Sequence, residues 1–136
     1  SEIINDQQRN TLILEDVLLS LKYGRSPLIL TQRKEHAVFF EQHLSQFCKN
    51  VIVMTGGQNT KKRLEIKLQL ETISDEEERV IIATGGYIGE GFDDKRLDTL
   101  FLTMPISWHG TLAQYAGRLH RIHAHKKEVI IYDYVD

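Results

Sequence analysis

The sequence is poor in residues that would cross-link it or anchor it in a membrane. It has one cysteine among 136 residues, which excludes an internal disulfide and a cysteine-rich zinc site. No apolar run approaches the roughly 20 residues that a membrane-spanning helix needs, and no charged-then-apolar leader resembles a signal peptide. We therefore expect a cytoplasmic protein with no membrane partner. We interpret Cys48 as a small apolar filler near a helix end.

Two phosphate-binding motifs are also missing. There is no G-x-x-x-x-G-K-[ST] loop that would hold a triphosphate alone, and Gly86, Gly89 and Gly91 do not have the spacing of a dinucleotide fingerprint.

The acidic run at 74–80 precedes its strand, whereas a Mg²⁺-holding acid belongs after one, so we interpret it as a solvated turn. The histidines within 109–125 lack a recognised ligand spacing, and we expect no metal site.

The charge of the chain is unevenly distributed. The formal net charge of −2 argues against a generally basic nucleic-acid binder. Residues 71–98 hold nine acids against three basic residues, whereas residues 114–127 hold four basic residues and no acid. One local basic face is therefore present, and it is a weak indication of phosphate binding.

Apolar runs of strand length alternate along the chain with stretches of helical periodicity. This alternation predicts one α/β domain over residues 1–136, a mostly parallel sheet with helices on both faces. Residues 6–23 form the helix that leads into it, and Gly24 is its expected C-cap. The expected strands are 26–31, 50–55, 79–84, 98–103 and 128–135, and the other expected helices are 34–47, 59–73 and 111–123.

Four of the expected strands end in threonine, and a polar or glycine-rich loop follows each one. Ligands of open parallel sheets bind outside the carboxyl ends of the strands, so these loops are expected to share one edge. Any single threonine is explained by its preference for strands. Four in register, two of them followed by Gly-Gly, favour a site where exposed amides and hydroxyls meet phosphate oxygens. The threonines are Thr31, Thr55, Thr84 and Thr103.

The helix expected at 111–123 contains the stretch QYAGRLHR. Thr111 and Gln114 form a capping box at its start. Gln114, Arg118 and Arg121 then fall within an arc of about 60°, opposite the apolar stripe. The arginines have no acid four residues away, and a pair of planar guanidinium groups suits a phosphoryl group. A solvated arginine face is the alternative.

QYAGRLHR resembles motif VI of superfamily 2 helicases, Q-x-x-G-R-x-x-R. ATGGYIGEGFDD resembles motif V, LILTQRKEHAVFFEQHL is similar to motif IV, and MTGGQNTKKR resembles the nucleic-acid-contacting loop between them. The resemblance covers the second RecA-like domain, from about residue 25 to the end, and the DEAD/DEAH-type, restriction-enzyme-like group is the most similar. It implies a RecA-like fold and the C-terminal half of an ATP-dependent helicase or translocase, a hydrolase whose isolated C-terminal half we expect to be inactive.

The resemblance also implies roles for individual residues. Arg121 would be the arginine finger on the γ-phosphate and Arg118 its neighbour, the two catalytic positions. ATP would lie between this domain and an N-terminal RecA-like domain that holds Mg²⁺. The implied nucleotide-binding residues are Gln114, Gly91 and Asp93. The residues implied to bind DNA or RNA through its phosphates are Gln32, Arg33, Thr55, Gly56, Gly57, Thr84 and Gly85.

Two other classes of protein remain as alternatives. The first is a non-catalytic nucleic-acid-binding module of the same fold, which would keep the loops without a motor partner. The second is a doubly wound small-molecule or signalling domain. That class requires a self-sufficient ligand site, and neither a phosphate loop nor a cofactor fingerprint supports it.

Overall fold

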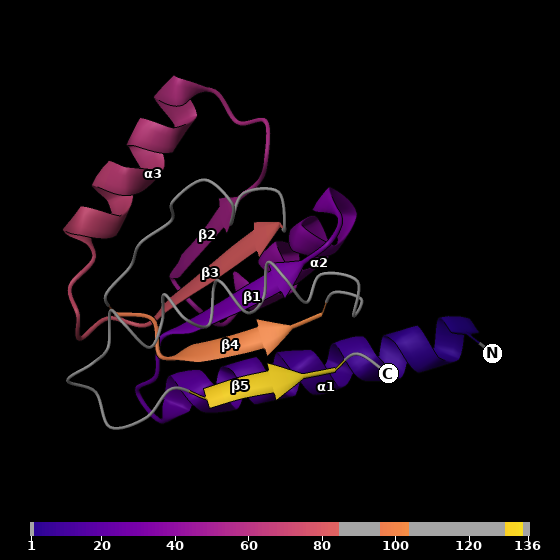
Figure 1. The fold of residues 1–136 in the computed structure, drawn as a ribbon. Helices are drawn as coiled ribbons and strands as arrows, with labels where there is room; N and C mark the ends of the chain where they lie inside the picture. The colour runs from indigo at the N-terminus through magenta and orange to yellow at the C-terminus, as the bar shows by residue number, and fades with distance from the viewer. Residues whose placement is uncertain (1, 85–95, 104–129, 135–136) are drawn as a thin grey trace.

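A computed structural model describes residues 2–84, 96–103 and 130–134 of the chain. The described strands form one parallel sheet in the order β2-β3-β1-β4-β5 (Figure 1). Their bounds are Pro27–Thr31 for β1, Asn50–Met54 for β2, Arg79–Thr84 for β3, Thr99–Leu102 for β4 and Ile130–Asp133 for β5. The described helices are α1 (Glu2–Lys22), α2 (Lys34–Leu44) and α3 (Thr60–Thr72). The sequence prediction of a RecA-like α/β sheet is confirmed.

Both faces of the sheet are covered, because successive side chains of each strand point to opposite sides. On one face, Ile29, Ile82 and Phe101 pack against α1 and α2. On the other face, Ile81 and Leu100 belong to the cluster that Ile66 of α3 completes. Figure 1 shows α1 and α2 behind the sheet and α3 on the opposite side. The continuous apolar strands of the sequence therefore follow from burial on two faces.

Two helix ends are fixed by local hydrogen bonds, and the C-cap predicted at Gly24 is confirmed. At the end of α1, Gly24 has φ of +76°, and the amides of Gly24 and Arg25 donate to the carbonyls of Leu21 and Ser20 at 3.0 Å each. This pair of bonds is a Schellman motif, which favours glycine in the left-handed conformation. At the start of α3, the Asn59 side chain accepts from the amide of Lys62 at 2.8 Å. Both ends are thus fixed by short-range hydrogen bonds.

Strand β5 is attached to α1 as well as to β4. The ring of Tyr132 stacks on that of Phe101, with centroids 4.8 Å apart and planes 7° from parallel. The Tyr134 hydroxyl donates to Asp16 Oδ2 of α1 at 2.5 Å. Burial first, and then this bond to a carboxylate, raise the pKa of Tyr134 far above its usual value. The phenol therefore remains a donor at any physiological pH.

The amino ends of the strands are joined by a second polar network. Asp98 Oδ1 accepts from the amide of Ser26 at 2.8 Å, and Arg25 Nε donates to Thr99 Oγ1 at 2.6 Å. Arg96 Nε donates to Ser26 Oγ at 2.8 Å, and its guanidinium also reaches the carbonyl oxygens of Ser74 and Glu77. These bonds tie β1 to β4 and to the turn before β3. The amino edge of the sheet is therefore held together by hydrogen bonds among its own residues.

The expected elements within the described residues all form, with small differences at their ends. Helix α1 starts at Glu2 rather than at residue 6, and α2 ends at Leu44 rather than at 47. Strands β2 and β4 end at Met54 and Leu102, one residue before the threonines assigned to them. In the run 74–80 predicted as a solvated turn, residues 74–76 and Glu78 are exposed, but Arg79 and Val80 are buried in β3. Cys48 is buried, as expected for an apolar filler. The helix expected at 111–123 lies outside the described residues.

Among the described residues, the helices are too short or too polar to cross a membrane.

Candidate nucleic-acid interface

The carboxyl ends of β2, β3, β1 and β4 meet at one edge of the sheet, as the sequence predicts for parallel strands. Thr31 is opposite Thr84, and Met54, which precedes Thr55, is opposite Ala83. The Thr103 amide continues the ladder by donating to the carbonyl of Leu30 at 3.0 Å. With strands about 4.8 Å apart, the four threonines form a row about 14 Å long.

The four threonines differ in their exposure. Thr31 and Thr84 are 0% and 6% exposed, whereas Thr55 and Thr103 are half-buried. The Thr103 hydroxyl donates to the carbonyl of Leu30 at 2.7 Å. The Thr84 hydroxyl accepts from the amide of Gly56 at 3.2 Å. Thr31 and Thr84 therefore form the floor of the edge, and the loops after the strands form its outer surface.

The loop between β2 and α3 is held by side chains on both of its sides. Gly56 is bonded to Thr84, and Gln58 Nε2 donates to the carbonyl of Val53 at 3.3 Å. Asn59 caps α3. Between these attachments, Gly57 is exposed and has φ of +88°, a conformation that L side chains rarely adopt. The loop thus presents its glycine backbone outward from a fixed position.

Gln32 and Arg33 follow β1, and both are exposed at the same edge. Arg33 is the N-cap of α2, with an extended backbone and no side-chain cap bond. Its carbonyl accepts from the amide of Ala37 at 3.2 Å. Helix α2 therefore begins at the carboxyl edge, and the side chains of Gln32 and Arg33, just before the helix, are accessible there.

Three lysines outside the predicted set of site residues extend the basic character of this edge. Lys34 is exposed in the first turn of α2, and Lys61 and Lys62 are exposed in the first turn of α3. Cations are disfavoured at a helix N-terminus, where the helix dipole is positive, and α3 has no acid in its first turn. The signal available in the sequence was the basic run at 61–63, which directly follows Thr60.

The edge also contains opposing charge. Glu35 lies in the first turn of α2, and Glu65 Oε2 lies 4.0 Å from Lys62 Nζ. Both partners of that pair are more than half exposed, and such surface pairs contribute at most about 1 kcal/mol. Lys62 can therefore leave Glu65 for a stronger anion at little cost.

The remaining predicted site residues lie outside the described residues. They are Gly85, Gly91, Asp93, Gln114, Arg118 and Arg121. The predicted set is thus divided. The residues assigned to nucleic acid are described except for Gly85, and those assigned to the nucleotide are not.

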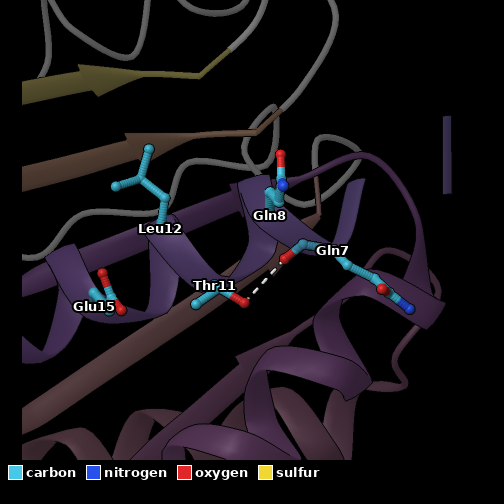
Figure 2. Close-up of a pocket in the computed structure, with 5 residues that line it drawn as sticks. All are labelled: Gln7, Gln8, Thr11, Leu12 and Glu15. Carbon is cyan, nitrogen blue, oxygen red and sulfur yellow. Dashed lines mark hydrogen bonds between the residues drawn. The ribbon is translucent and has the colours of Figure 1, made fainter. Parts of the chain in front are cut away.

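A shallow hollow lies along α1 (Figure 2). The described residues that line it are Gln7, Gln8, Thr11, Leu12 and Glu15, all from one helix. The Thr11 hydroxyl is bonded to the carbonyl of Gln7 at 2.9 Å. With one carboxylate among amides, a hydroxyl and a leucine, these side chains do not form a recognisable catalytic or metal-binding set.

Within residues 2–84, 96–103 and 130–134, no three His, Cys, Asp or Glu side chains form a metal-binding group.

Residues 9–123 match the family model of the helicase conserved C-terminal domain. The chain belongs to this family of helicase C-terminal domains. Among curated proteins it is similar to transcript termination protein A18 of vaccinia virus (strain Ankara), with 28% identity over 118 residues. Its counterpart in ectromelia virus (strain Moscow) is 29% identical over 119 residues. The match covers 85% of this chain and 23% of either relative, so the helicase domain spans about a quarter of their length.

Solved structures share the fold of this helicase domain at low sequence identity. The crystal structure of T4 UvsW has a TM-score of 0.73 at 20% identity, over 98% of this chain and 26% of that one. The C-terminal part of the Fun30 ATPase domain has 0.70 at 17%, over 85% and 36%. Domain 2 of the Mss116p DEAD-box helicase, bound to an RNA duplex, has 0.66 at 13%, over 94% and 51%. These likenesses establish the RecA-like fold.

Proposed function

We propose that this helicase domain is the C-terminal half of an ATP-dependent nucleic-acid helicase or translocase. In this proposal, residues 1–136 form one domain, with residues 1–24 leading into it from an N-terminal RecA-like domain. The observation that carries the proposal is the carboxyl edge. At this edge, a chain of the helicase C-terminal family presents a fixed glycine loop and exposed cations.

The described edge suits the backbone of a nucleic acid rather than its bases. Arg33, Lys34, Lys61 and Lys62 are exposed, and long flexible cations bind phosphates with little geometric demand. The loop at Gly57 allows a strand to come close, because there is no side chain in the way. The RNA duplex bound to Mss116p domain 2 and the relatives' name, transcript termination protein, support a nucleic-acid substrate.

The proposal also includes the binding of ATP and Mg²⁺. The residues assigned to ATP, Arg118 and Arg121 above all, come from the resemblance of QYAGRLHR to motif VI and lie outside the described residues. In the proposed protein, ATP binds between the two RecA-like domains and the N-terminal domain holds Mg²⁺. The arginines stabilise charge on the transferring phosphoryl group.

Nucleic-acid binding is tested by titrating labelled single strands into the chain at several salt concentrations. Each phosphate neutralised on a single strand contributes roughly 0.7 to the slope of log affinity against log salt. With both of the exposed lysines Lys61 and Lys62 changed to Gln, the slope should fall by roughly 1.4. A matched change of Lys22 and Lys49, exposed cations away from this edge, should leave it unchanged. Affinity independent of salt would contradict the proposal.

The catalytic role is tested in a protein that carries this domain together with an N-terminal RecA-like ATPase domain. Arg121→Ala should slow ATP hydrolysis by about 10³ to 10⁵ while leaving nucleic-acid binding nearly intact, because an arginine finger acts on charge that builds up only during transfer. Arg121→Lys should restore little, since an ammonium lacks the planar fork. ATPase of Arg121→Ala within about threefold of wild type would instead favour a non-catalytic binding module.

A further inference from the structure

We infer that Thr84 is a positioning residue, one that fixes the Gly56–Gly57 loop for nucleic acid without contacting it. The inference rests on the proposed function and changes the role assigned to one of its residues. The resemblance to motif V made Thr84 a phosphate contact. The structure places it at the bottom of the edge, 6% exposed, with its hydroxyl engaged by the neighbouring loop.

The hydrogen bond joins two segments that are far apart in the sequence. The Gly56 amide donates to Thr84 Oγ1 at 3.2 Å, across 28 residues. The two meet because β2 pairs with β3 up to the register of Met54 with Ala83. One step beyond that register, β2 has ended and the ladder has no further backbone pair. The Thr84 hydroxyl takes the place of the next backbone acceptor, so the loop starts from a defined point.

The bond between Gly56 and Thr84 determines which groups of the loop can face a ligand. A backbone amide has one hydrogen, and that of Gly56 points to Thr84. Gly56 is half-buried and Gly57 is exposed, so the outward surface of the loop is centred on Gly57. Gly57, with its left-handed φ, lies between this bond and the start of α3 at Thr60. Thr84 therefore sets the direction in which Gly57 is presented.

Among the described residues, the other bonds of the loop's side chains are local. Strand β2 is the first in the sheet order, with β3 as its neighbour among the described strands. Gln58 is bonded to Val53 of the same strand, and Asn59 to its own helix. Within the described residues, the bond from Gly56 to Thr84 joins this loop to another strand. Rigidity of a binding loop lowers the ordering cost on association, so this bond contributes to affinity.

The experiment compares Thr84→Val, which has the same shape without the hydroxyl, with Thr84→Ser, which keeps it. Amide hydrogen exchange of Gly56 is measured by NMR on the free chain, and affinity is measured with a labelled oligothymidine at low salt. Thr84→Val should speed Gly56 exchange and weaken binding, each by about tenfold, or roughly 1.4 kcal/mol. Thr84→Ser should resemble wild type in both. Thr72→Val is the control, because its hydroxyl bonds to Gln69 within α3 at 2.8 Å.

The outcomes separate the inference from the proposed function. Weaker binding by Thr84→Val with Gly56 exchange unchanged would make Thr84 a direct contact and overturn the inference. Faster exchange with unchanged affinity would overturn it as well, and would leave the proposed function standing. If wild type binds no oligothymidine at low salt, the proposed function fails, whatever the exchange shows. Should Thr84→Val not fold, an unprotected Gly56 amide in the wild-type chain would refute the inference by itself.

Discussion

Gly57 and Gly24 form a matched pair for testing the glycine loop. Both have positive φ, +88° and +76°, and a Cβ built on either meets nothing within 4 Å. Alanine would therefore be strained by its backbone alone at both positions. The left-handed conformation costs an L residue roughly 1–2 kcal/mol, and loss of chain entropy in the unfolded state returns about 0.4–1 kcal/mol. We expect each substitution to lower the free energy of unfolding by about 1 kcal/mol.

The two variants should differ in nucleic-acid affinity. Gly24 caps α1 and takes part in a Schellman motif away from the loops, so Gly24→Ala should leave affinity unchanged. In Gly57→Ala, the strain is relieved by rotating the loop away from its binding position. Fixing one residue again on binding costs about 1–2 kcal/mol, which is a factor of roughly 5 to 30 in affinity.

Thermal unfolding and titration of a labelled single strand measure the two quantities in the same samples. Each melting temperature should fall by about 2 to 6 °C. If both variants bind as wild type does, the conformation of Gly57 has no part in recognition. If both lose affinity equally, the loss reports stability and the argument from the loop fails. Only a loss confined to Gly57→Ala supports it.

Further predictions concern the stability of the described core. Tyr134→Phe should cost about 1–2 kcal/mol in urea unfolding, and a double-mutant cycle with Asp16→Asn should show coupling, because the bond joins α1 to β5. Asn59→Ala should cost about 1 kcal/mol through loss of the α3 cap. Ile82→Ala should cost about 2–5 kcal/mol, since Ile82 is 0% exposed. Burial raises the pKa of the Cys48 thiol, so a thiol reagent should react with Cys48 only after urea unfolds the chain.

The sequence was sufficient to predict the described strands, because each is an apolar run of strand length. Strands β1, β3 and β4 are buried on both faces, whereas β2 is partly buried and Ile131 of β5 is exposed. It also predicted the helix ends at Gly24 and Asn59, where the decisive bonds span at most five residues. The strand order was not predictable in this way. Every residue of β1 is buried, which would suit several central positions in a parallel sheet. Strand order depends on how the crossovers pack, and that packing involves contacts distant in sequence.

The same limit explains what was predicted about the candidate site and what was missed. The threonines at the strand ends predicted that the loops after them share one edge of the sheet, and the described strands do end at one edge. Their separate roles depend on neighbours, because only the pairing of β2 with β3 brings Thr84 under Gly56. The exposed Lys61 and Lys62 were visible in the sequence as a basic run, but their place depends on α3 starting at the carboxyl edge.

Local chemistry and strand order thus contribute different parts of the proposed interface. Gly57 would adopt positive φ in many loops, and a threonine would suit many strand ends. Their combination is specific, since the loop after β2 is bonded through Gly56 to the last residue of β3. The chain continues directly from Thr84 into the segment that resembles motif V. A displacement at the end of β3 would therefore reach the Gly56–Gly57 loop through one hydrogen bond. This bond directly connects the segment that resembles motif V with the loop that resembles the nucleic-acid contact of helicases.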